Sequence, residues 1–267
     1  MSRPERLPIR DPAVVASYQE LVRFLRFYRH HGTPVIVGGW AVYFHNSYYG
    51  SVDIDVVGAS LKGAFEEIVE KYEIANGYQF VMGPFGVESS ASKPIFRGRR
   101  KLGEMEIDAC SYERREAARF HEDKSKSLPY SLCDRKALRT EVRVAKDAVC
   151  YVPNRELLTL FKVKARRDRS FDVRERGATM NPERLAWLQG KVVKDGSDII
   201  ALLDPKPRRA LLHGSMDYAK LKDVATEFGV RGMVKETLRE VLEDQRALRQ
   251  YGRSVDAKGL LRVVNEF

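Results

Sequence analysis

The stretch from Val35 to Val57 constrains the fold more than any other part of the chain, and it reads VIVGGWAVYFHNSYYGSVDIDVV. It begins with three β-branched residues, a run that is long enough for a covered strand and too short for a helix. Two glycines end this strand, and residues 40–46 follow as a short helix. Residues 51–57 have the period of a second strand. The stretch therefore predicts a strand, a sharp turn, a helix and a strand in close succession.

Two pairs of residues in this stretch point to chemistry. Gly38 and Gly39 leave the first backbone amides of the helix free to bind an anion such as phosphate. Asp53 and Asp55 lie two residues apart in the second strand, so their carboxylates share one face. Adjacent carboxylates repel unless a cation holds them, and carboxylate oxygens suit magnesium. Magnesium beside a phosphate site indicates chemistry on a nucleoside triphosphate.

Each pair alone has an ordinary explanation, since Gly-Gly often precedes a helix and Asp-x-Asp often lies in a solvated turn. Their order along the chain, with apolar residues on both sides of the carboxylates, favours a site. It resembles the signature of the nucleotidyltransferase superfamily, whose fold is shared by polymerase beta and small bacterial nucleotidyltransferases. Many members have serine at the position of Gly39, and an arginine and a threonine where this chain has Tyr49 and Ser51. The resemblance implies a nucleotide-binding role for Gly38, Gly39 and Ser51.

A third carboxylate is predicted on a later strand. Residues 104–110 read EMEIDAC, so the three acids share one face and the apolar residues share the other. This alternation alone also fits an edge strand with an acidic, solvated face. The superfamily carries a third carboxylate on such a strand, and Asp108 matches it best, with Glu106 as the rival. The resemblance implies that Asp53 and Asp55 bridge two Mg²⁺ or Mn²⁺ ions, and that Asp108 binds one ion and accepts the proton of an attacking hydroxyl.

A second resemblance lies in the C-terminal part of the chain. Asn154 is a good helix cap, and apolar residues recur at helical spacing after it. The segments LFKVKARRDR and KDGSDIIALL are similar to paired motifs of the AbiEii-type toxins of toxin-antitoxin systems. The match falls on Lys162 in the first segment and on Lys194, Asp195 and Asp198 in the second. It implies that Lys162 holds the triphosphate, and that Asp195 or Asp198 orients a base or the acceptor. Without the resemblance, the segments read as amphipathic helices with surface salt bridges.

The fold class predicted by these patterns is an α/β nucleotidyltransferase domain with a mixed sheet, residues 1–152, followed by a mostly helical domain, residues 153–267. Gly196 is expected to interrupt or strain one helix, and residues 170–182 are expected to form a mobile connection. The helices of the first domain are expected at 11–31, 40–46 and 61–72. Its strands are expected at 35–37, 51–57, 78–82, 94–96, 104–110, 138–144 and 148–152. The later helices are expected from 154 onward, at 183–203, 217–228, 230–251 and 255–267.

The net charge of the chain indicates which kind of partner the protein binds. The 267 residues carry 47 Lys and Arg against 37 Asp and Glu, a formal charge of +10. Residues 1–150 hold 23 basic and 20 acidic side chains, whereas residues 151–267 hold 24 and 17. The second part is therefore the better place for a polyanion such as nucleic acid. A basic turn at 97–101, just before the strand of Asp108, is a further candidate contact for the triphosphate or the acceptor.

Three cysteines without metal-ligand spacing support neither a disulfide framework nor a zinc site. The sequence shows no signal peptide and no membrane span, so we expect a cytoplasmic protein with no membrane partner. The predicted function is transfer of a nucleoside monophosphate from a triphosphate to an acceptor hydroxyl, on RNA such as tRNA, by a toxin with an antitoxin protein as partner. Two alternatives stay open: the same transfer to a protein side chain or an antibiotic, and a non-catalytic nucleic-acid-binding module on the same fold.

Overall fold

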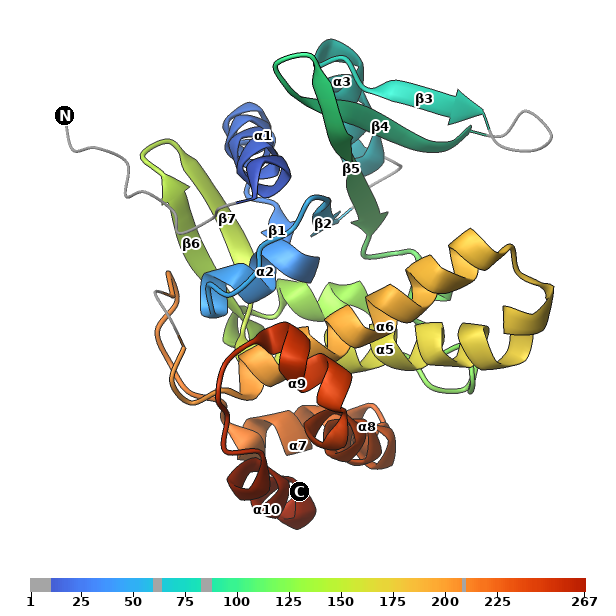
Figure 1. The fold of residues 1–267 in the computed structure, drawn as a ribbon. Helices are drawn as coiled ribbons and strands as arrows, with labels where there is room; N and C mark the ends of the chain where they lie inside the picture. Colours follow the sequence, from blue (N-terminus) through green and yellow to red (C-terminus); the bar gives the residue numbers. More distant parts are fainter. Residues whose placement is uncertain (1–10, 60–63, 83–87, 208–209) are drawn as a thin grey trace.

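A computed structural model describes residues 11–59, 64–82, 88–207 and 210–267 (Figure 1). Its centre is a mixed seven-stranded sheet with strand order β3-β4-β5-β2-β1-β7-β6. The strands are β1 (Val35–Ile36), β2 (Ile54–Gly58), β3 (Gln79–Met82), β4 (Glu88–Arg97), β5 (Arg100–Ser111), β6 (Arg139–Ala145) and β7 (Ala148–Pro153). Two pairs, β2 with β5 and β1 with β7, are parallel, and the other neighbours are antiparallel. The parallel pairing of β2 with β5 brings distant parts of the chain together at one sheet position.

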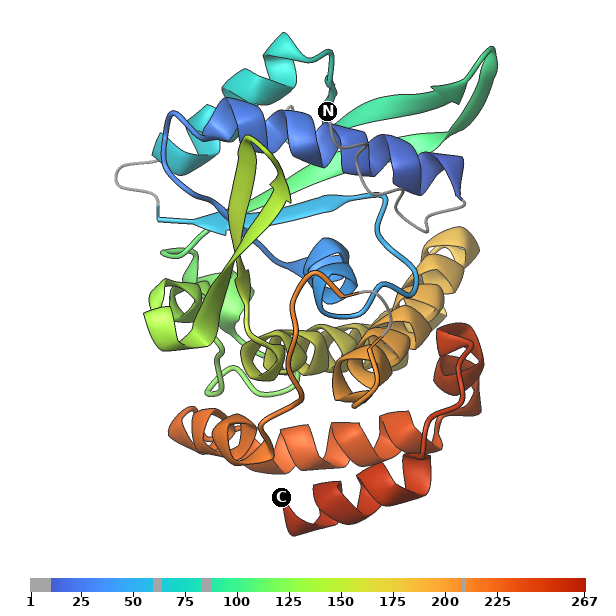
Figure 2. The same ribbon diagram turned by 90° about the vertical axis from the view of Figure 1, so that its left-hand side faces the viewer.

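Helices cover both faces of the sheet (Figure 2). One face carries α1 (Pro12–Tyr28) and α3 (Ala64–Ala75), and the other carries α2 (Gly38–His45). Beneath α2 lie the long neighbours α5 (Arg155–Arg176) and α6 (Pro182–Leu203). The remaining helices are α4 (Arg115–Ala118), α7 (Tyr218–Glu227), α8 (Arg231–Glu243), α9 (Gln245–Tyr251) and α10 (Ala257–Glu266), with short 3-10 turns at Tyr130–Asp134, Lys136–Leu138 and Gly177–Thr179. The helix α2 is thus enclosed between the sheet and the α5–α6 pair.

The predicted fold class, an α/β arrangement with a mixed sheet followed by a mostly helical part, is confirmed. The strands predicted at 138–144 and 148–152 pair as the hairpin of β6 and β7, and the Asn154 side chain caps α5 by accepting from the Leu157 amide at 3.0 Å. The helix predicted from residue 61 is seen from Ala64, and residues 60–63 lie outside the described part. The proposed domain boundary after residue 152 stays a prediction, and β7 runs one residue past it.

Three predictions about the helical part are wrong. Residues 170–176 continue α5 instead of forming a mobile connection, and Asp172 there accepts from His121 Nδ1 at 3.1 Å. The helix α6 runs through Gly196 without interruption, and a Cβ at that glycine would lie 2.5 Å from an Arg166 nitrogen. The helix predicted over 230–251 is split at Asp244, which caps α9 and pairs with Arg166 at 3.1 Å. Contacts between distant residues decide all three.

Buried apolar side chains form one cluster that extends from Val14 to Phe267. It includes Trp40 and Phe44 of α2, Leu157 and Leu158 of α5 and the Ile199–Leu203 turn of α6. Among the residues that the structure describes, no helix is both long enough and apolar enough to span a bilayer. The fold therefore fixes α2, with its glycine start, rigidly between the sheet and α5.

Candidate active site

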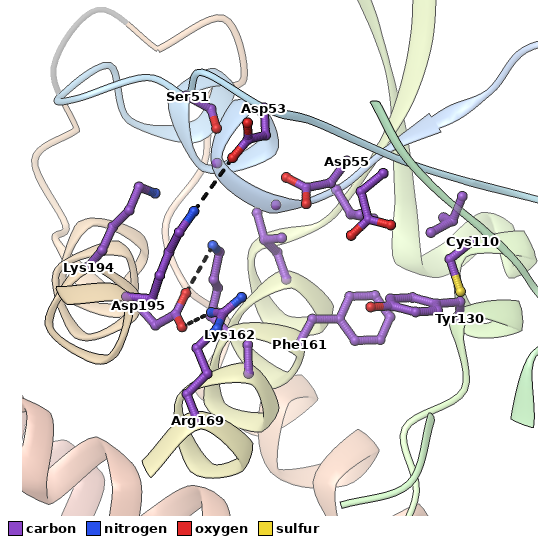
Figure 3. A pocket seen from close by; sticks show the side chains of 18 residues that line it. Ser51, Asp53, Asp55, Cys110, Tyr130, Phe161, Lys162, Arg169, Lys194 and Asp195 are labelled. Atoms are coloured by element: carbon purple, nitrogen blue, oxygen red, sulfur yellow. Dashed lines mark hydrogen bonds and ion pairs between the residues drawn. The ribbon is translucent and has the colours of Figure 1, made fainter. Parts of the chain in front are cut away.

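A pocket lies between the sheet and the α5–α6 pair (Figure 3). Its lining comes from β2, β5, the start of α2, and the facing sides of α5 and α6. Nine residues predicted for the site line it: Gly38, Gly39, Ser51, Asp53, Asp55, Asp108, Lys162, Lys194 and Asp195. The other two candidates, Asp198 and Glu106, do not belong to its lining. The structure thus gathers most of the predicted residues from five segments into one place.

The sheet side of the pocket carries three carboxylates, Asp53, Asp55 and Asp108, which we call the carboxylate wall. Figure 3 labels the first two. Asp55 in β2 is the direct register partner of Asp108 in the parallel strand β5. Asp53 precedes β2, which begins at Ile54, so the predicted strand is shorter than expected at this end. Its carboxylate still faces the pocket, where Oδ2 lies 3.5 Å from the Lys191 ammonium.

Like charges meet in this wall. Partial enclosure by the pocket and the neighbouring Asp55 raise the pKa of Asp108, while Arg114 acts in the opposite direction. Enclosure and the charges of Asp53 and Asp108 likewise raise the pKa of Glu106. Within the described ranges, neither Asp55 nor Asp108 forms an ion pair with a cationic side chain. Adjacent carboxylates without an ion-pair partner fit a divalent cation.

The same described residues contain no group of three His, Cys, Asp or Glu side chains already converged as a metal-ligand cluster. The donor set nevertheless fits magnesium, because it consists of hard carboxylate oxygens from two adjacent strands. Asp53 retains an exposed side-chain fraction of 37%, which leaves its oxygens accessible from the pocket.

The start of α2 lies against the carboxylate wall. The helix begins at Gly38 itself rather than at Trp40, and Gly38 has φ +63°, a conformation that favours glycine. A Cβ on Gly38 would lie 1.8 Å from Asp55 Oδ2, so a side chain here would displace the carboxylate. A Cβ on Gly39 would lie 2.8 Å from the Ser51 hydroxyl oxygen. The glycine pair therefore lets the first amides of a helix approach the Asp55 carboxylate and the Ser51 hydroxyl.

The helix side of the pocket is a paired network of charges. Lys162 of α5 lies 2.7 Å from Asp198 and 3.3 Å from Asp195, and Lys194 lies 3.0 Å from Asp198. The Tyr48 hydroxyl donates to Asp198, and the Arg169 guanidinium donates to Asp195. We call these residues, Tyr48, Lys162, Arg169, Lys194, Asp195 and Asp198, the helix network. In contrast to Asp55 and Asp108 of the carboxylate wall, every charge here has an opposite partner.

Burial makes the helix network rigid. The exposed fraction is 1% for Asp198 and 8% for Lys162. Burial alone would raise the pKa of Asp198, but Lys162 and Lys194 outweigh it and lower this pKa to about 2. Burial alone would lower the pKa of Lys162, but Asp198 and Asp195 outweigh it and keep the ammonium charged. Asp198 lies behind Lys162 as its anchor, while Lys162 and Asp195 reach the pocket surface.

Three pocket residues escaped the sequence reasoning: Arg169, Lys191 and Tyr130. Lys191 and Lys194 are three residues apart on α6, so their spacing on one helix face is the signal that could have found the first. Tyr130 comes from a segment without clear periodicity, and its ring packs 5.2 Å from that of Phe161. The basic turn at 97–101 does not line the pocket, because eight residues of strand, about 26 Å, separate Arg100 from Asp108.

Similarity to known proteins is confined to solved structures. No protein-family model and no curated protein sequence matches the chain. Among solved structures, a crystal structure of an antigenic nucleotidyltransferase-like protein from Paracoccidioides brasiliensis is similar, with a TM-score of 0.40 and 12% identity. The similarity covers 85% of this chain and 94% of that one. A similarity with this TM-score carries no argument about the activity of the protein.

Proposed function

We propose that the protein is a divalent-metal-dependent nucleotidyltransferase that moves a nucleoside monophosphate from a triphosphate to an acceptor hydroxyl and releases pyrophosphate. The observation that carries this proposal is the parallel register of Asp55 with Asp108 beside the glycine start of α2. A cation site and a phosphate site then share one pocket, which is what transfer from a nucleoside triphosphate requires.

Asp53, Asp55 and Asp108 would hold one or two Mg²⁺ ions, or Mn²⁺ in their place. When bound, such ions stabilise the charge on the attacking and leaving oxygens. Asp108 rather than Glu106 is the better third carboxylate, because Asp108 lines the pocket at the register of Asp55 and Glu106 does not line it. The Asp108 carboxylate would also accept the proton of the acceptor hydroxyl.

The triphosphate would lie between the glycine turn and α6. The amides at Gly38 and Gly39 and the Ser51 hydroxyl would donate hydrogen bonds to phosphate oxygens. Lys191 and Lys194 would balance the phosphate charge. The Lys194 ammonium lies close to the glycine turn, 3.3 Å from the point where a Cβ on Gly39 would stand. These two lysines of α6 take the place of the arginine that the superfamily motif has at Tyr49. Lys162 would contribute a fixed positive charge from behind them.

We propose RNA, such as tRNA, as the acceptor. The formal charge is +10, and residues 151–267 contribute +7 of it. In α5, Arg169 lines the pocket, and a guanidinium suits phosphate oxygens. A toxin role with an antitoxin protein as partner rests on the AbiEii-type resemblance alone and is part of the same proposal.

The test is a labelling assay with the purified protein, magnesium, each labelled nucleoside triphosphate in turn, and total RNA. We expect label in RNA with the wild type and none with Asp55→Asn. Glu104→Gln is the matched control, because Glu104 lies on the same strand face as Asp108 but pairs with Lys101 outside the pocket. This variant should label RNA at the wild-type rate.

Three results would contradict parts of the proposal. Label on protein or on an added aminoglycoside, with none on RNA, would replace the acceptor while keeping the reaction. Equal labelling by wild type and Asp55→Asn would remove the carboxylate wall from the mechanism. RNA binding without transfer to any acceptor, unchanged by Asp55→Asn, would favour a non-catalytic binding module.

A further inference from the structure

An exposed tryptophan stands on α6 between two cationic side chains. Trp187 keeps 45% of its surface accessible, which is unusual for the residue type with the largest apolar ring. The Arg184 guanidinium lies 4.2 Å from its ring centre and the Lys191 ammonium lies 5.2 Å from it. An accessible indole flanked by positive charge is the combination that stacks an unpaired base and contacts the phosphates beside it.

The position of this ring relative to the pocket is fixed by Lys191. The same ammonium that lies 5.2 Å from the Trp187 ring centre lies 3.5 Å from Asp53 Oδ2. The ring centre is therefore no farther from that carboxylate oxygen than the sum of these two distances. Lys191 also lines the pocket, so the exposed ring adjoins the mouth of the proposed active site.

We propose that Trp187 is a stacking platform for an unpaired base at the end of the acceptor RNA, with Arg184 and Lys191 contacting the flanking phosphates. This inference rests on the proposed function and narrows it to an acceptor with a single-stranded end. A base stacked on Trp187 places its own strand within reach of Asp53, so the terminal hydroxyl can enter the carboxylate wall. A base inside a duplex offers no face to the ring, because both of its faces are already stacked on neighbouring base pairs.

The two tryptophans of the chain provide a direct readout. Trp40 is fully buried and donates to the Ser17 hydroxyl at 3.1 Å, whereas Trp187 is accessible. Full-length protein is titrated, in EDTA to prevent turnover, with a short single-stranded RNA and with the same sequence as a blunt duplex. We expect the single strand to quench the intrinsic fluorescence more strongly than the duplex, whose only free base faces are those of its two terminal pairs. Trp187→Phe should remove the quenching while retaining RNA binding by anisotropy of a labelled strand.

Substitutions then separate stacking from structure. Trp187→Ala should raise the KM for RNA by about 5- to 100-fold, the span that base–aromatic stacking accounts for, and leave the KM for the triphosphate unchanged. Trp187→Phe should restore most of the loss, because phenylalanine offers a smaller stacking face. Phe96→Ala is the matched control: Phe96 is 58% exposed beside basic residues, but it lies on the β4–β5 hairpin away from the pocket.

Several outcomes would overturn the platform. Trp187→Ala with unchanged RNA KM, equal quenching by single strand and duplex, or an effect of Phe96→Ala equal to that of Trp187→Ala would each do so. Dependence of protein labelling, but not of RNA labelling, on Trp187 would assign the ring to a protein acceptor instead. Quenching in EDTA together with no transfer to any RNA would leave the platform standing and refute the proposed reaction.

Discussion

On the sheet side of the pocket, Asp55 and Asp108 lie at matched register, and within the described residues neither has a cationic partner; on the helix side, Asp198 has Lys162, Lys194 and Tyr48. The first arrangement costs stability in the protein alone, since like charges repel. The second removes charge from water but pairs it fully. The difference indicates that the carboxylate wall is arranged to bind something, whereas the helix network holds α5 and α6 in position beside it.

The largest expected effect separates activity from stability. Asp55→Asn should reduce nucleotidyl transfer by about a thousandfold or more, because it removes charge that would hold a metal at the reacting phosphate. It should not lower the free energy of unfolding without metal, because the substitution also removes a like-charge contact. Transfer rates check the expected loss of activity, and urea unfolding of the metal-free variant checks the free energy of unfolding. A destabilised Asp55→Asn protein would show that the carboxylate wall is structural.

A substitution in the helix network should affect stability, whereas the substitution in the carboxylate wall should affect activity. Asp198→Asn should lower the free energy of unfolding by about 3 to 5 kcal/mol, because it leaves the buried Lys162 ammonium short of its main partner. Glu116→Gln, which removes an exposed pair with Arg119, should change it by less than about 1 kcal/mol. Urea unfolding of the three proteins at neutral pH provides the measurement. A small effect of Asp198→Asn would mean that the network is not a stabilising element.

Acidification should weaken the helix network only at pH values near the pKa of Asp198, about 2. The pKa of Asp198 is about 2 in the folded protein, below the ordinary value of 3.8, so its stabilising contribution is complete above about pH 4 and is lost as the pH falls through 2. The stability difference between wild type and Asp198→Asn should therefore shrink by about 2 kcal/mol over this window. Unfolding curves of both proteins at several acidic pH values check it, and a constant difference would contradict the depressed pKa.

The smallest effect concerns metal binding to the intact protein. Magnesium at ten times its dissociation constant should stabilise the wild type by about 1.4 kcal/mol, because only the folded state presents the carboxylate wall. Asp55→Asn should lose this gain, and Asp198→Asn, where folded, should retain it. Thermal unfolding with and without magnesium measures the shift. Stabilisation of Asp55→Asn equal to that of the wild type would place the ion elsewhere.

The elements around the candidate site could be predicted because each carries a local signal. The β-branched run at Val35, the glycine pair and the alternation of residues 104–110 follow from backbone sterics and strand period alone. The proximity of Asp55 and Asp108 could be predicted only through the resemblance to the superfamily. Their strands pair across more than fifty residues of chain, and no local pattern sets that register.

The remaining features depend on tertiary contacts that have no local signal. The last turns of α5 persist because residues such as His121 pair with them, and α6 is continuous at Gly196 because Arg166 packs there. The pairing of Lys191 with both Trp187 and Asp53 joins two faces of the pocket that are far apart in sequence. Whether Lys162 contacts a ligand or supports the pocket from behind is likewise a matter of packing, which spacing cannot reveal.

The order in which the pocket residues occur along the chain has a consequence for synthesis. The lining begins at Val37 in the N-terminal part and is completed only by Lys194 and Asp195 of α6. On the ribosome, the first pair of carboxylates is made long before the lysines that face them. A nascent chain consequently cannot assemble this pocket until α6 has emerged from the ribosome.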